Sequence, residues 1–77
     1  FRLQVGSFQK RSDTRVLVEQ LTRLGLPVYV QAVELPELGL WHRVYAGPFA
    51  SRTTAEANQR LIREKLKISA LLVHGGK

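Results

Sequence analysis

The sequence lacks cysteine, is poor in histidine and contains no long apolar run. The absence of cysteine excludes disulfides, thiolate metal sites and thiol nucleophiles. The histidines are His42 and His74 alone, and a catalytic zinc needs about three protein ligands, so we expect neither a metal nor a cofactor. No run approaches the roughly 18 apolar residues of a membrane span. We therefore expect no membrane insertion within this chain.

Acidic residues are also few, with six Asp and Glu against twelve Lys and Arg, which gives a net charge of +6. This balance favours an anionic partner such as nucleic acid, anionic lipid or an acidic polysaccharide. The alternative is that several of the cations merely solvate a helix. The cations concerned are Arg60, Arg63, Lys65 and Lys67.

The remaining composition is that of a globular protein, with 44% apolar and 23% charged residues among 77. We expect residues 1–77 to form one domain with a core that both halves share, because so small a domain buries only about 60% of its surface. The chain opens directly on the strand-like FRLQVG. We therefore expect it to be part of a longer protein.

The sequence repeats itself once. A shift of 41 positions superimposes Leu3 on Val44, Gly6 on Gly47 and Phe8 on Phe49, and it later pairs Val30 with Leu71. Residues 1–36 and 42–77 therefore represent two versions of one unit.

Each half has the pattern strand, helix, strand. Ser12 is expected to cap the first helix, and Thr53 with Glu56 forms a capping-box signature for the second. Alternating or β-branched segments predict strands at 1–6, 28–33, 41–47 and 70–73, with 34–40 as a connection. We expect an α+β, βαββαβ ferredoxin-like or RNP-like fold, in which two helices cover one face of a four-stranded antiparallel sheet.

The repeat predicts which residues of the third strand face the helices. Leu3 and Val5 have the apolar character of core residues, and their repeat mates are Val44 and Ala46. The alternate residues then lie on the helix-free face. This set is Trp41, Arg43 and Tyr45, together with Arg2, Gln4 and Gln31.

The same shift predicts the faces of the last strand. Because Val30 matches Leu71 and is expected in the core, Leu71 and Val73 are predicted to be buried. Ala70, Leu72 and His74 are predicted on the other side.

Aromatic and planar hydrogen-bonding groups on an open sheet face favour a binding platform. The alternative is that Trp41 and Tyr45 only cover the sheet surface, or that another domain packs against them.

The stretches FRLQVGSF and LWHRVYAGPFASRTTAEA, within an internal repeat, resemble the SPOR (sporulation-related) domain family. The resemblance implies the same βαββαβ fold and a non-catalytic module that binds peptidoglycan. Such modules favour denuded glycan strands, which lack stem peptides, and direct parent proteins to the division septum. The localisation implied is the periplasmic side of the bacterial cell envelope, and we expect a monomer. The family positions that match are Gln4, Ser7, Trp41, Arg43 and, on the last strand, Leu72.

The chemistry of these side chains suits a denuded glycan. Removal of the stem peptide leaves a lactyl carboxylate on N-acetylmuramic acid, which Arg43 can bind in a bidentate contact. Gln4, Gln31 and Ser7 can hydrogen-bond hydroxyl and acetamido groups. Trp41 or Tyr45 can pack against a pyranose ring.

Two other classes of function fit less well. RNA-recognition domains share this topology, but WHRVYAGPF does not fit their third-strand pattern, so we expect no nucleic acid. An enzyme would need a catalytic group with a partner. Ser7 has no evident base, and Glu34 and Glu37 are expected to solvate their loop.

Overall fold

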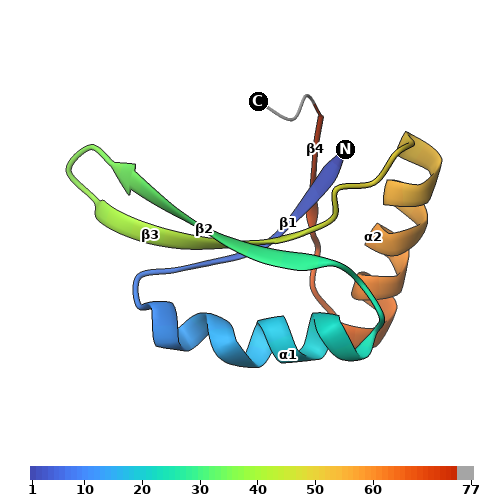
Figure 1. Cartoon of the computed structure of the whole chain (residues 1–77), viewed down its shortest axis with the longest axis horizontal. Coiled ribbons are helices and arrows are strands. Elements are labelled where there is room, and N and C mark those ends of the chain that lie inside the picture. Colours follow the sequence, from blue (N-terminus) through green and yellow to red (C-terminus); the bar gives the residue numbers. More distant parts are fainter. Residues whose placement is uncertain (75–77) are drawn as a thin grey trace.

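The computed structural model describes residues 1–74, which form a four-stranded antiparallel sheet and two α-helices (Figure 1). The elements in chain order are β1 (Arg2–Phe8), the 3₁₀ helix η1 (Arg11–Thr14), α1 (Arg15–Arg23), β2 (Val28–Leu35), β3 (Gly39–Ala46), α2 (Arg52–Leu66) and β4 (Leu71–Val73). The strand order is β2-β3-β1-β4. The predicted α+β fold is therefore confirmed, and β1 and β3 are the central strands of the sheet.

Both helices pack against the same face of the sheet. Leu3 and Val5 of β1 and Val44 and Ala46 of β3 belong to one buried cluster, as the repeat predicted. The helices contribute their own buried residues to this cluster, namely Leu17, Leu21, Ala55 and Ile62. The opposite face of β1 and β3 is consequently free of helices.

The helices begin at other residues than the sequence predicted. Ser12 lies inside η1, and α1 follows directly from that 3₁₀ turn without a side-chain cap. The N-cap of α2 is Ser51 rather than Thr53, because the Ser51 hydroxyl accepts a hydrogen bond of 3.1 Å from the backbone N–H of Thr54. Satisfying such a free N–H is what an N-cap side chain does.

The segment 34–40, predicted as a connection, is mostly strand. β2 and β3 pair from Val28 opposite Ala46 to Leu35 opposite Gly39, so only residues 36–38 remain in the turn. Pro36 is followed by Glu37 with a φ of 67°, and the N–H of Leu38 donates to the carbonyl of Leu35. These are features of a type II turn. The hairpin extends past the rest of the sheet, as Figure 1 shows.

A β-bulge in β1 changes the face on which the following side chains lie. Gln4 is opposite Tyr45, but Gly6, and not Val5, is opposite the next β3 residue, Val44. The extra residue restarts the alternation, so Ser7 lies opposite Arg43 on the helix-free face. Glycine suits position 6 because a Cβ atom there would lie 2.8 Å from Cδ2 of Leu17.

The two halves do not keep a constant offset. Leu21 and Ile62, 41 positions apart, are both fully buried. Beyond them the matching core residues are 42 positions apart. These pairs are Leu24 with Leu66, Leu26 with Ile68, Val28 with Ala70 and Val30 with Leu72.

The additional residue lies near the end of α2. The first half leaves its helix through Gly25, with a φ of 82°, and the second leaves α2 through Lys67, with a φ of 61°. Gly25 and Lys67 are themselves 42 positions apart, like the core pairs that follow them. Side chains of a strand alternate between the two faces of the sheet. One additional residue before a strand therefore places each of its side chains on the face opposite to the one that the 41-residue offset predicts.

Candidate functional site

The helix-free face is built from residues that lie opposite one another on neighbouring strands. Across the sheet, one row consists of Ser7, Arg43 and Gln31, and the next consists of Gln4, Tyr45 and Tyr29. Opposed residues share a face and lie close enough to act together. Trp41 lies opposite Val33 beside these rows, towards the hairpin. The predicted set of residues on this face is therefore confirmed for all three strands.

The first row is polar and open to solvent. Ser7 and Gln31 are exposed on either side of the half-buried Arg43. Within residues 1–74, no carboxylate lies within ion-pair distance of the Arg43 guanidinium; the pair found is Arg52 with Glu56 on α2. The row therefore presents a cation flanked by hydrogen-bonding groups and free to bind an anion.

In the second row, Tyr29 and Arg2 cover the ring of Tyr45 and form a cluster with it. The rings of Tyr29 and Tyr45 stack with centroids 5.2 Å apart, and the guanidinium carbon of Arg2 lies 4.4 Å from the centroid of the Tyr45 ring. Arg2 also donates a hydrogen bond of 3.0 Å from Nη1 to the Tyr29 hydroxyl. That bond raises the pKa of Arg2 above its ordinary value, although partial burial opposes the shift.

The cluster corrects the expected role of Tyr45. Its side chain is on the predicted face but is only 2% exposed, because Arg2 and Tyr29 cover it. A sugar cannot reach this ring. Tyr45 instead supports the Arg2 side chain from below.

Of the two aromatic residues predicted for this face, Trp41 rather than Tyr45 is open to a ligand. It is half-buried, and its indole Nε1 is inaccessible and has no hydrogen-bond partner within residues 1–74. The accessible part of the side chain is therefore carbon. This arrangement suits packing against an apolar ring face better than donation of a hydrogen bond.

The predicted faces of the last strand are wrong. Leu72 lies opposite Leu3 and packs against the core, and Ala70 is only 6% exposed. Leu71 lies opposite Gln4 and is 61% exposed. The cause is the additional residue at the end of α2, which the constant repeat offset did not include. The aliphatic side chains that this strand adds to the helix-free face are Leu71 and the half-buried Val73, which lies opposite Arg2.

The histidines do not form a site. His42 lies opposite Ala32 and Phe8 on the helix side of the sheet, and His74 stacks on Phe1 at 4.4 Å between ring centroids. Within the described part of the chain, no three His, Asp or Glu side chains gather as metal ligands. None of the helices in that part is both long and apolar enough to cross a membrane.

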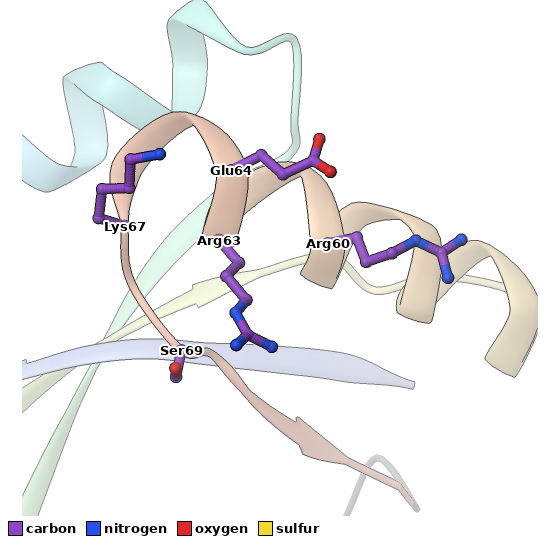
Figure 2. Close-up of a pocket in the computed structure, with 5 residues that line it drawn as sticks. All are labelled: Arg60, Arg63, Glu64, Lys67 and Ser69. Atoms are coloured by element: carbon purple, nitrogen blue, oxygen red, sulfur yellow. The ribbon is translucent and has the colours of Figure 1, made fainter.

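An open depression of about 520 Å³ lies against α2 on the other side of the molecule, and it is lined by Arg60, Arg63, Glu64, Lys67 and Ser69. Figure 2 shows that Arg63 points towards Ser69, whereas Arg60, Glu64 and Lys67 point in other directions. Cations that diverge in this way do not surround one anion. Their arrangement agrees with the interpretation that these residues solvate the helix.

A small α+β domain with a polar, cationic and partly aromatic sheet face has the form of a binding module. The SPOR domain family matches residues 1–73, and the chain belongs to this family of peptidoglycan-binding modules found in bacterial cell-envelope proteins. It is a binding domain and not a catalytic one. SPOR domains are typically associated with cell division and the septum.

A solved structure supports the assignment. The chain is similar to the crystal structure of the RlpA SPOR domain from Pseudomonas aeruginosa, with a TM-score of 0.83 and 28% sequence identity. The similarity covers 96% of this chain and 97% of that chain. No curated protein matches the sequence.

Proposed function

We propose that the chain binds peptidoglycan glycan strands that lack stem peptides, through its helix-free sheet face. The observation that carries the proposal is the row of Ser7, Arg43 and Gln31, with its unpaired cation, next to the accessible carbon surface of Trp41. This combination matches a polymer in which neutral sugars alternate with carboxylate-bearing sugars.

Arg43 provides the selectivity for denuded strands. Once an amidase has removed the stem peptide, the lactyl group of N-acetylmuramic acid carries a free carboxylate. A guanidinium binds a carboxylate through two parallel hydrogen bonds, which are stronger than neutral ones. An attached peptide neutralises this carboxylate as an amide and also obstructs the approach to a flat sheet.

The neighbouring side chains bind the uncharged parts of the sugars. Ser7, Gln31 and Gln4 hydrogen-bond hydroxyl and acetamido groups, and Trp41 packs against a pyranose ring. Leu71, exposed opposite Gln4, extends the apolar contact at the β4 edge. Tyr45 takes part only through the support that it gives to Arg2.

The biological role follows from this ligand. Denuded strands arise where amidases act, so the domain, as a monomer on the periplasmic side, directs its parent protein to the division septum. It performs no chemistry itself. Residues 1–77 act as one such domain of a longer protein.

The test is retention of the domain on isolated peptidoglycan sacculi, with and without prior amidase treatment. We expect strong retention of the wild type on amidase-treated sacculi and weak retention on untreated ones. Trp41→Ala and Arg43→Gln should both reduce retention on the treated material. Arg60→Gln is the matched control, because it removes the same charge from an exposed position on α2.

Two outcomes contradict the proposal. Equal retention on both kinds of sacculi, removed by a salt wash and lowered equally by Arg43→Gln and Arg60→Gln, would show that only the net charge of +6 acts. Steeply salt-dependent binding of an oligonucleotide at similar affinity would indicate a nucleic-acid function instead.

A further inference from the structure

Arg2 is held in place more firmly than an exposed arginine. Its guanidinium lies over the Tyr45 ring at 4.4 Å and donates to the Tyr29 hydroxyl at 3.0 Å. The side chain therefore loses little freedom when it binds a ligand, which favours affinity. No carboxylate within residues 1–74 forms an ion pair with it.

The contacts of Arg2 determine which of its donors remain for a ligand. A guanidinium has five N–H groups. One on Nη1 donates to Tyr29, and Nε is buried without a partner in the described part of the chain. The second N–H of Nη1 and the two of Nη2 remain. These three N–H groups on the two terminal nitrogens are the donors that a carboxylate can use.

The position of this cation relative to Arg43 follows from the strand geometry. The guanidinium of Arg2 lies above Tyr45, and Tyr45 is two residues from Arg43 on the same face of β3. Strands rise about 3.4 Å per residue, so the supporting ring and the base of Arg43 are about 7 Å apart along β3. The face thus carries two separate cations in line along one strand.

We propose that Arg2 and Arg43 form two separate carboxylate sites, which bind consecutive N-acetylmuramic acid residues of one denuded strand. Tyr29 is the positioning residue that holds the first of these cations. The inference rests on the proposed function, and it adds that the domain recognises a pair of exposed carboxylates and not a single one. A strand with isolated denuded sugars is then a poorer ligand than a continuously denuded one.

The experiment compares two defined denuded fragments by NMR titration, which measures weak affinities. One is a disaccharide with one muramic acid carboxylate, and the other is a tetrasaccharide with two. Arg2→Gln should weaken tetrasaccharide binding by roughly tenfold, the effect of losing one charge-assisted contact, and should leave disaccharide binding unchanged. Arg43→Gln should weaken both, and Arg60→Gln neither.

Tyr29→Phe tests the positioning role without removing a charge. It should weaken tetrasaccharide binding several-fold in the wild-type background and have no further effect in Arg2→Gln. A merely structural role of the hydroxyl would lower affinity equally in both backgrounds. That result would contradict the role assigned to Tyr29.

The remaining outcomes separate this inference from the proposed function. If Arg2→Gln weakens both fragments equally, the two arginines share one carboxylate, and the two-site inference is wrong. If it weakens neither, Arg2 is not a ligand-binding residue. If the wild type binds neither fragment nor denuded sacculi, the proposed function itself fails.

Discussion

Leu71 lies opposite Gln4 on the helix-free face of the sheet, and it is 61% exposed. Its neighbour Leu72 lies opposite Leu3 and packs against the core. Two adjacent leucines thus lie on opposite faces of the sheet, one open to solvent and the other in the core.

Substitution of these two leucines by alanine should affect different properties, namely stability for Leu72 and binding for Leu71. Leu72→Ala removes packing from the core and should lower the free energy of unfolding by about 2 kcal/mol, the lower end for such changes because the residue is partly buried. Leu71→Ala should change stability by less than about 0.5 kcal/mol and should reduce binding to denuded sacculi. Urea unfolding and sacculus retention measure the two effects, and the reverse pattern would contradict the β4 register.

Trp41→Ala should weaken binding to denuded glycan by roughly 5- to 150-fold, since a covered aromatic face contributes on the order of 1–3 kcal/mol. The matched control is Leu40→Ala. Leu40 adjoins Trp41 on β3 and is 52% exposed, but it faces the opposite side of the hairpin. Equal losses for the two variants would show that the hairpin as a whole, and not the face of the sheet, makes the contact.

The N-cap of α2 predicts a stability difference between two hydroxyl residues. Ser51→Ala removes the acceptor for the Thr54 N–H and should cost about 1 kcal/mol in the free energy of unfolding. Thr53→Ala, two residues later in the first turn, should cost less than about 0.5 kcal/mol. Thermal or urea unfolding of the two variants shows which of the two residues caps α2. A larger loss of stability for Thr53→Ala would favour the capping box expected from the sequence.

Lys67→Gly should stabilise the domain. A side chain at a φ of 61° is unfavourable by roughly 1–2 kcal/mol, and glycine avoids this cost at the expense of greater freedom in the unfolded chain. We expect a net gain of about 0.5–1 kcal/mol. Lys65→Gly, inside α2, should instead lose about as much. A loss of stability in Lys67→Gly would contradict the left-handed conformation.

The fold and most of the site could be predicted because alternation and repetition agree over β1 and β3. Leu3 and Val5 fixed the buried set, and their matches on β3 placed Trp41 and Arg43 on the other face. Both strands lie before the point at which the two halves differ in length, so the constant offset still applied to them.

The faces of β4 could not be predicted from the repeat, because one added residue lies between the core positions Ile62 and Leu66 and the strand has only three residues. The signal was present in the spacing of Ile68, Ala70 and Leu72, which alternate as buried residues do. The burial of Tyr45 was hidden for another reason. It depends on how Arg2 and Tyr29 lie across the sheet, which alternation along one strand does not describe.

The β2–β3 hairpin and the three-residue β4 give the two ends of the binding face different shapes. Trp41 stands near the hairpin, and Arg2 and Leu71 lie at the far end beside the short strand. A glycan strand also has two different ends, one reducing and one non-reducing. The domain is therefore expected to accept its ligand in a single direction, so that every copy bound along a strand points the same way.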